Sequence, residues 1–278
     1  MARIVGMILA VMMMICPSWG ETLRVISLYP GHSDNIYAMG GSEILVALSE
    51  NDDDDLLPGL PRISLRSGAE RILALRPDVV ITRPFAERIN PNMYDVLRRS
   101  GVNVISLDPP EWDSFPEYLH TLANALNLNP DEAISRLDSI RGEISREAMN
   151  ANHPRVFLEA TSRELHTCPP GSWAARLIEL AGGVNIAGDA VPLRPGSAIA
   201  PYGVERVLRN AASLDVYIIQ NGAMNTATLK DFHAREWSGA LRHVKVYEIP
   251  ERYMSRPSLL GLEKGGRELL RIFKEAGR

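Results

Sequence analysis

The sequence predicts an α/β protein of two similar lobes with mainly parallel sheets, joined by a long rigid helix, with a ligand cleft between the lobes. Three observations favour this fold. Short β-branched apolar runs alternate with helical patterns along most of the 278 residues, which is typical of parallel sheets covered by helices. Residues 113–152 show helical patterns alone. After this segment, the order of elements in the first half begins again.

The first lobe is expected over residues 21–112. Its strands are short runs rich in Val and Ile that end at Pro, Gly or polar residues, which indicates buried strands. Its first helix is expected to be capped by Ser33 and Asp34, to run toward Ile44 and to be interrupted or ended near Gly40. The other expected elements are strands over 24–29, 62–65, 78–82 and 101–107 and helices over 68–75 and 91–100.

The run NDDDD at 51–55 places four carboxylates in succession, shortly before the turn-forming Pro58 and Gly59. A calcium loop needs ligands at alternating positions and a closing Glu, and this run has neither. We therefore expect a solvated surface loop here rather than a metal site.

Residues 113–152 are expected to form a helical spine between the lobes. One helix is expected over 114–128, where apolar residues share one face, and a second begins at Asn129 and Pro130 and runs to about residue 150. A linker this long and this helical predicts a rigid connection rather than a flexible hinge.

The second lobe, over 153–278, repeats the order of the first. The phrase GAERIL at 68–73 returns as GVERVL at 203–208, and a helix that meets a Gly-Gly pair precedes it in both halves. Because the flanking elements also match in order, we interpret the chain as a duplicated architecture. The remaining expected elements are strands over 155–159, 215–219 and 244–249 and helices that begin at Ser172 and Pro257.

The N-terminus has the pattern of a cleavable signal peptide over residues 1–20. Arg3 provides a positive charge, an uninterrupted apolar run covers 4–15, and the small residues Ser18 and Gly20 precede the expected cleavage point. The apolar run is shorter than the roughly 20 residues that a membrane-spanning helix needs. The mature chain is therefore expected to be a soluble periplasmic protein.

The two cysteines bear on anchoring and on disulfides. A lipid anchor at Cys16 is the less favoured alternative, because Ile15 is large where a lipid-attachment site has a small residue. Cleavage of the signal peptide leaves Cys168 alone, so the mature chain cannot form an intrachain disulfide. Its stability must come from packing.

Composition and motifs argue against several functions. The formal net charge is −4 and there is no basic stripe, so nucleic acid is not an expected partner. The sequence has no GxSxG or HExxH motif and no paired cysteines, so an exported enzyme has no support beyond Cys168 and scattered histidines. A receptor for bare zinc or manganese would need several converging ligands, and only His32 and His166 fall in expected cleft loops.

Taken in order, these segments resemble the periplasmic binding proteins that serve ABC importers of iron-siderophores, heme and cobalamin. The resemblance covers nearly all of 22–275. It implies two lobes joined by one long helix, no catalytic residues, no intrinsic cofactor, and a monomer that captures a metal chelate. The segments that carry it are RVISLYP followed by MGG, GAERILALRPDVVI, SWAARLIELAGGVNIA, GVERVL and SRPSLLGLE.

The resemblance also implies a docking role for the repeated phrase. In this family a Glu on each lobe pairs with arginines of the permease dimer, and the matching positions are Glu70 and Glu205. A near-symmetric permease needs two like anions at a fixed separation, and charge-assisted pairs to Arg set register and speed encounter. The alternative is that both acids only favour the helix dipole in a first turn. Arg71 and Arg206 are expected to flank the acids or to pair locally.

Ligand residues are expected in the loops at the carboxyl ends of the strands, where open parallel sheets bind ligands. Arginines there suit carboxylate or catecholate oxygens, aromatic side chains suit a flat chelate, and His166 is a candidate axial ligand. Cys168 is interpreted as a small buried residue, and the identity of any metal ligand stays open. The candidates are Tyr29, His32, Arg66, Arg83, Trp112, His166, Trp173, Tyr202, Tyr253 and Arg256.

Departures from the family pattern bear on the choice of chelate. Cobalamin-binding members often place a Trp shortly before each docking Glu, and neither ISLRS nor SAIAPY contains one. The Tyr that heme-binding members often place in the first lobe is absent as well, whereas Arg66 fits siderophore or heme binders. An iron-siderophore-type complex is therefore the leading ligand, with a corrinoid or heme as the alternatives.

Overall fold

A computed structural model describes residues 22–53, 55–149, 152–192, 194 and 196–277. The expected signal peptide lies outside these residues and stays a prediction. None of the helices in the described residues is long and apolar enough to cross a lipid bilayer.

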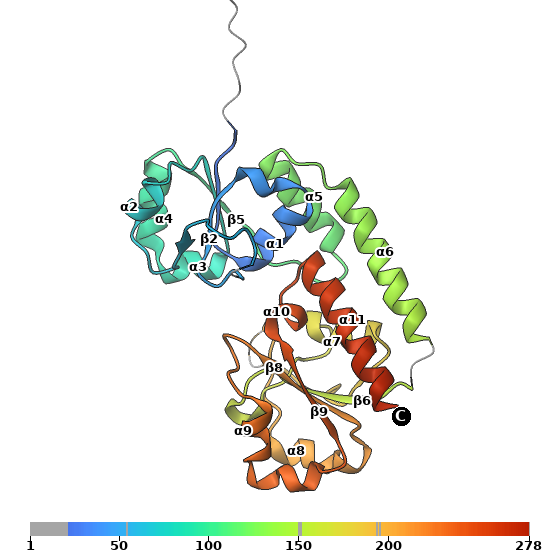
Figure 1. The fold of residues 1–278 in the computed structure, drawn as a ribbon. Helices are drawn as coiled ribbons and strands as arrows, with labels where there is room; N and C mark the ends of the chain where they lie inside the picture. Colours follow the sequence, from blue (N-terminus) through green and yellow to red (C-terminus); the bar gives the residue numbers. More distant parts are fainter. Residues whose placement is uncertain (1–21, 54, 150–151, 193, 195, 278) are drawn as a thin grey trace, which may run out of the picture.

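The N-terminal lobe contains a sheet of five parallel strands in the order β3-β2-β1-β4-β5 (Figure 1). Its strands are β1 (Val25–Ser27), β2 (Leu45–Ser49), β3 (Arg62–Ile63), β4 (Val79–Thr82) and β5 (Asn103–Ser106). Its helices are α1 (Pro30–Ala38), α2 (Ala69–Leu73), α3 (Pro84–Ile89) and α4 (Pro91–Arg99), with a 3-10 turn over Gly41–Ile44.

The C-terminal lobe contains a second parallel sheet, in the order β7-β6-β8-β9. Its strands are β6 (Arg155–Glu159), β7 (Val184–Asn185), β8 (Val216–Asn221) and β9 (Lys245–Pro250). Its helices are α7 (Trp173–Leu180), α8 (Val204–Arg209), α9 (Leu229–His233), α10 (Glu251–Met254) and α11 (Leu259–Ala276), with 3-10 turns over Arg163–Leu165, Ala211–Ser213 and Glu236–Leu241. The predicted fold class, two lobes with parallel sheets and a long connecting helix, is confirmed.

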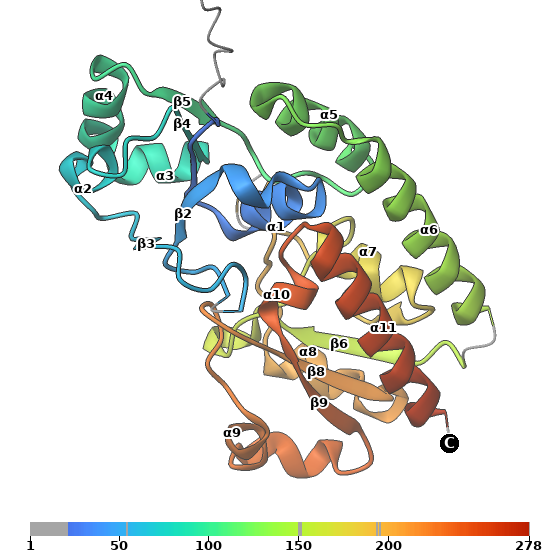
Figure 2. The same ribbon diagram turned by 45° about the horizontal axis from the view of Figure 1, so that its top comes forward.

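Two long helices follow the N-terminal sheet, and they have different positions. Helix α5 (Phe115–Leu126) packs against α1, whereas α6 (Asp131–Ala148) runs from the N-terminal lobe to the C-terminal lobe (Figures 1 and 2). Helix α11 packs along α6. Of the two helices in the expected spine, α6 is therefore the one that joins the lobes. Helix α11, the last of the chain, lies alongside it.

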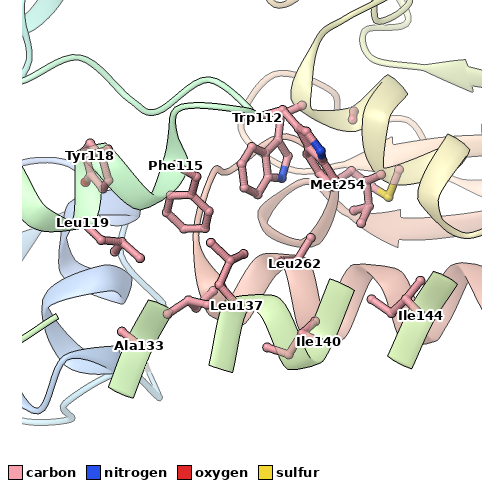
Figure 3. Close-up of a cluster of buried hydrophobic side chains, with 14 of the residues drawn as sticks. Trp112, Phe115, Tyr118, Leu119, Ala133, Leu137, Ile140, Ile144, Met254 and Leu262 are labelled. Atoms are coloured by element: carbon pink, nitrogen blue, oxygen red, sulfur yellow. The ribbon is translucent and has the colours of Figure 1, made fainter. Parts of the chain in front are cut away.

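One hydrophobic core continues from lobe to lobe through these helices. It contains Val25 of the first sheet, Val156 of the second, and the inner faces of α5, α6 and α11. Figure 3 shows Ile140 and Ile144 of α6 on the side that faces Leu262, Met254 and Trp112. Because the core is shared, separating the lobes would expose apolar surface, which is costly in water.

Consecutive glycines let α11 pack against two neighbours at once. A Cβ on Gly265 would lie 2.1 Å from the carbonyl oxygen of Tyr253, and a Cβ on Gly266 would lie 2.2 Å from Cδ1 of Ile144. The first contact is with α10 and the second with α6. A side chain at position 265 would meet backbone and push α11 outward, whereas one at 266 would require Ile144 to move.

Some predicted elements of the first lobe are wrong. Ser33 and Asp34 do not cap α1 but lie buried inside it, because the helix already begins at Pro30, whose fixed φ suits a first turn. The helix ends at Ala38, close to the expected end near Gly40, and the chain turns through Gly40, with φ of +77°, toward β2. Strand β2 and helix α3 are absent from the predicted elements; α3 again begins with a Pro in a segment expected to be a loop.

Replacing Gly265 by Ala is expected to lower the free energy of unfolding by about 1–3 kcal/mol, because the new methyl meets a backbone oxygen that cannot rotate away. Gly142→Ala is the matched control, since Gly142 also lies inside a helix but has open space around it, and Ala there should be neutral or stabilising by up to about 1 kcal/mol. Urea unfolding of both variants measures the difference. Equal stabilities would contradict the close approach of α11 and α10.

Candidate functional site

The lobes meet at the segments that follow the carboxyl ends of their strands. Asn35 in α1, after β1, donates to the carbonyl oxygen of Pro257 (3.2 Å) and accepts from the backbone N–H of Leu259 (3.2 Å), both after β9. The hydroxyl of Ser258 donates to Asp34 (3.1 Å). The carboxyl ends of both sheets therefore face this junction, which is where parallel sheets bind ligands.

An ion-pair network closes one side of the junction. Asp53 of the N-terminal lobe pairs with Arg252 (2.8 Å) and Arg256 (3.5 Å), and Arg256 also lies 4.0 Å from Asp34. The expected solvated loop at 51–55 is therefore wrong. Asp53 belongs to a contact with residues some two hundred positions away, and Arg256, a ligand candidate, is occupied in joining the lobes.

Two aspartates beside this network are buried. Burial raises the pKa of Asp34 to about 6, and Arg256 opposes that shift. Burial likewise raises the pKa of Asp52 to about 7, although Asp52 accepts a hydrogen bond from the backbone N–H of Ser49 (2.8 Å). One carboxylate oxygen of each residue has no hydrogen-bond partner. The junction is therefore sensitive to protonation near neutral pH.

Tyr29 and Arg83 form a half-buried pair at the ends of β1 and β4. The guanidinium of Arg83 lies 4.2 Å from the ring centroid of Tyr29. Burial raises the pKa of the Tyr29 hydroxyl, while Arg83 and Arg256, one from each lobe, lower it, so the hydroxyl lies within range of both lobes. Among the residues that the structure describes, Arg83 has aromatic neighbours but no carboxylate partner. It is free to meet an anion.

Exposed apolar side chains lie on both sides of the junction. Phe85 (52% exposed) and Ile89 belong to α3, which lies on the side of the N-terminal lobe that faces the C-terminal lobe (Figures 1 and 2). Met224 is exposed on the loop that follows β8 of the C-terminal lobe. Exposed apolar groups gathered near charged ones are typical of a binding surface.

His32 is buried in the N-terminal lobe rather than lining a cleft, contrary to the prediction. Its ring is fully buried; Nδ1 lies 2.6 Å from the hydroxyl of Tyr118, and Nε2 lies 3.2 Å from the carbonyl oxygen of Thr82 and 3.0 Å from that of Leu107. Burial lowers the pKa of His32 to about 4, so the ring is neutral. Both nitrogens are occupied, because α1 begins at Pro30 and turns this side chain into the core.

Trp112 and Trp173 are likewise wrong as cleft residues. Their rings pack together at 5.0 Å, Trp173 also contacts Phe115 at 5.2 Å, and the guanidinium of Arg141 covers Trp112 at 4.6 Å. Both rings are more than nine-tenths buried in the core that the lobes share (Figure 3 labels Trp112). They join the lobes rather than offering a face to a chelate.

Two predicted tyrosines have neighbours other than Tyr29 and Arg83. The hydroxyl of Tyr202 donates to the carbonyl oxygen of Ile186 (3.1 Å) within the core of the C-terminal lobe. The ring of Tyr253 lies near Lys264 of α11, 5.4 Å from its ammonium nitrogen, beside a groove along that helix. The hydroxyl of Tyr253 accepts from Arg252 (3.3 Å), which pairs with Asp53. Neither is brought together with Tyr29 and Arg83.

Arg66 stays a candidate. It is exposed in the loop before α2. The side chain of Asn90, at the end of α3, donates to the carbonyl oxygens of Leu65 (3.3 Å) and Ser67 (3.2 Å) and so holds this loop beside α3.

His166 lies in a strained loop after β6. Glu164 and Leu165 have φ of +54° and +44°, a left-handed backbone that costs energy in residues other than glycine. The loop is held because Thr167 exchanges backbone hydrogen bonds with Ala200 (both 2.8 Å). Nε2 of His166 is buried without a hydrogen-bond partner, 3.6 Å from the Glu164 carboxylate. A buried nitrogen without a partner is unusual and fits a group that meets a ligand.

Cys168, two residues further, is a small buried residue, as interpreted. Burial raises the pKa of its thiol to about 12, which keeps it protonated and unreactive. Within the described part of the chain, no three His, Cys, Asp or Glu side chains are arranged to hold a metal ion.

Glu70 and Glu205 are exposed in the first turns of α2 and α8. Their neighbours pair locally, as expected: Arg71 donates to the carbonyl oxygen of Arg62 (3.0 Å) and Arg206 pairs with Asp189 (2.6 Å). The two glutamates are therefore available to a partner on the outer surface of each lobe.

A buried pair at the end of β6 escaped the sequence analysis. Glu159 is fully buried, and both its oxygens accept from Arg235, at 2.7 and 2.8 Å. The hydroxyl of Tyr217 donates to the same carboxylate (2.6 Å). In the sequence, a Glu at the end of an apolar strand indicates that a buried acid needs a partner. No sequence pattern identifies Arg235 as that partner. The pair fixes the segment after α9 against the end of the sheet.

Comparisons with known proteins agree with this architecture. A family model described as "Periplasmic binding protein" matches residues 25–253. The vitamin B12-binding protein of Vibrio cholerae is 26% identical over 244 residues, which cover 84% of this chain and 83% of that protein. The vitamin B12-binding protein of Pectobacterium carotovorum is 29% identical over 175 residues, which are 60% of this chain and 62% of that protein's own length.

Two solved structures have the same fold. The periplasmic heme-binding protein RhuT from Roseiflexus, in apo form, has a TM-score of 0.71 and 20% identity, covering 92% of this chain and 100% of its own. The vitamin B12-binding protein BtuF of Vibrio cholerae has a TM-score of 0.65 and 21% identity, covering 92% and 98%.

Because Asp34 and Asp52 are buried, the free energy of unfolding is expected to fall as pH rises. The folded protein binds the proton of Asp52 more tightly than the unfolded chain, whose Asp has a pKa near 3.8, so this contribution is largest below about pH 4 and is lost as pH rises through about 7. Asp52→Asn is expected to flatten the decline in unfolding free energy between about pH 5 and 8. A smaller decline should remain, because the pKa of Asp34 is also raised.

Urea unfolding at several pH values measures this slope. Asp138→Asn, an exposed position on α6, is the control and should keep the wild-type slope. An unchanged slope in the Asp52 variant would contradict its burial as the cause.

Proposed function

Because the chain belongs to the periplasmic binding protein family, we propose that it captures a metal chelate between its lobes and delivers it to the permease of an ABC importer. It is a carrier and not an enzyme, and its cargo is a ligand rather than a resident cofactor. The observation that carries the proposal is the pairing of Tyr29 and Arg83 at the carboxyl ends of β1 and β4, within electrostatic range of Arg256 from the other lobe.

The side chains at the junction favour an anionic chelate with an apolar body. Arg83 and the exposed Arg66 suit carboxylate or catecholate oxygens, and Phe85, Ile89 and Met224 suit apolar surface. An iron-siderophore-type complex meets both requirements and is the leading ligand. The buried tryptophans do not contribute to this choice.

A tetrapyrrole is the second candidate. The two relatives from Vibrio cholerae and Pectobacterium carotovorum are vitamin B12-binding proteins, and one structural neighbour is a heme-binding protein. The specific observation in favour of heme is His166, whose Nε2 is buried without a hydrogen-bond partner on a strained loop at the end of β6. Such a nitrogen suits an axial ligand of iron.

Delivery would use the exposed acids of the two repeats. Glu70 and Glu205 occupy the same position in similar first turns, one on each lobe, and α6 and α11 hold the lobes at a fixed separation. Two anions at a fixed distance fit arginines on a near-symmetric permease dimer. The protein would act in the periplasm as a monomer.

Titration of the mature protein with ferric siderophores, hemin and cobalamins tests the ligand. Tryptophan fluorescence is a suitable signal because Trp112 and Trp173 lie where the lobes meet. Saturable quenching by a ferric siderophore is expected. Binding of none of these chelates, together with turnover of another compound, would contradict import as the function.

Arg83→Gln is expected to weaken binding of the chelate about tenfold, because one charge-assisted contact to the ligand is lost. The side chain is partly exposed, so the fold should be retained. Arg146→Gln is the control, since Arg146 is exposed on α6 and its Nε donates to the carbonyl oxygen of Gly142 (3.1 Å). Equal affinities of the two variants would remove Arg83 from the site.

Glu70→Lys combined with Glu205→Lys is expected to abolish uptake in cells while leaving the affinity for the chelate unchanged, because both acids lie outside the junction. Glu132→Lys is the matched control: Glu132 is also an exposed acid in a first helical turn, but on α6. Uptake assays and titrations of the same variants separate the two effects. A parallel loss of affinity would make the acids ligand residues instead.

A further inference from the structure

The C-terminal lobe contains a cavity that is separate from the junction of the lobes. Its volume is about 440 Å³, within the range of small-molecule sites. Arg155, the first residue of β6, and Arg209, the last of α8, line it, so it lies toward the amino end of β6, away from the carboxyl ends of the strands. Helix α8 lies on the side of this lobe farthest from the N-terminal lobe (Figure 1).

The walls of this cavity are positively charged. Three arginines, Arg155, Arg206 and Arg209, face a single acid, Asp189. All four act on the hydroxyl of Tyr202, whose pKa is raised by burial, so their charges lie close together. Like charges repel at short range, and a cluster of guanidinium groups is stabilised by an anion.

Most of the guanidinium donors remain available. Arg206 stacks on the ring of Tyr202 at 4.0 Å and pairs with Asp189 at 2.6 Å. Arg155 donates from Nε to the hydroxyl of Ser213 (3.2 Å), which leaves its two terminal nitrogens. Arg209 has no ion pair within the described part of the chain. The guanidinium groups of Arg155 and Arg209, and the remaining N–H groups of Arg206, can therefore donate hydrogen bonds to the oxygen atoms of an anion.

Asp189 shows how a carboxylate sits in this cavity. The hydrogen bond from Arg206 lowers the pKa of Asp189, so the acid is ionised. Its side chain is 73% exposed and lies on a loop. Exposed ion pairs of this kind contribute little to stability, so an anion that bonds to several arginines at once would displace it at small cost.

We propose that this cavity is a second ligand site, which binds a small multivalent oxyanion of the phosphate or polycarboxylate class through Arg155, Arg206 and Arg209. The repeated phrase does not carry this site into the first lobe, because Arg71, the counterpart of Arg206, donates to the carbonyl oxygen of Arg62 instead. The two lobes thus share the exposed Glu but differ at the next residue. This site is independent of the chelate that binds between the lobes.

Calorimetric titration of the mature protein with inorganic phosphate and with citrate tests the proposal. Saturable binding to one site is expected for at least one of the two anions. Arg206→Gln combined with Arg209→Gln should raise Kd at least about tenfold, because two charge-assisted contacts are lost. Arg71→Gln is the matched control and should bind as the wild type does.

Asp189→Asn provides a test that loss of folding cannot imitate. It removes the competing carboxylate and should lower Kd, while a chelate bound between the lobes should leave that Kd unchanged. Absence of saturable binding in the wild type, equal weakening in the Arg71 variant, or weaker binding in the Asp189 variant would each overturn the proposal.

Discussion

The first turn of α11 is bound by side chains of α1, and the relative position of the two lobes depends on this contact. Asn35 both accepts from Leu259 and donates to the carbonyl oxygen of Pro257, while Asp34 accepts from Ser258. These groups are buried, so breaking their hydrogen bonds without replacement would be costly. The contact joins the end of the first strand to the end of the last, across almost the whole chain.

A junction held in this way suits a receptor that changes shape little when it binds. Helix α6 spans the lobes, α11 packs along it, and the ion pairs of Asp53 close one side. Large closure would have to break this network and expose the shared core, so small adjustments of loops are expected instead. The strained loop around His166 and the exposed helix α3 are the parts that can adjust. Such a frame keeps Glu70 and Glu205, the proposed docking acids, at one separation.

The duplicated lobes have kept one feature and changed others. Glu70 and Glu205 are exposed at equivalent positions, yet the glycines before them have different backbone conformations. Gly68 has φ of −71°, which any residue adopts, whereas Gly203 has φ of +88°, which favours glycine. The following arginines also have different partners. The exposed Glu is the same in both lobes, whereas the residues on either side of it have different conformations and partners. This indicates that the acid is the feature that both lobes retain.

The sequence by itself determined the architecture: strand and helix periodicity, the Pro and Gly positions and the repeated phrase predicted two parallel sheets and the helical connection. These are local patterns, and local patterns decide which face of an element is apolar. They also placed Tyr29 and Arg83 at strand ends, and the structure brings these two together. Tertiary structure alone decided which candidates face a ligand. His32 and Trp112 belong to residue types that bind chelates, but both are buried. The sequence predicts that Asp53 is solvated, but its ion pair with Arg252 joins the lobes. The physical reason is that burial and pairing depend on partners far along the chain, and no periodicity within one segment specifies them.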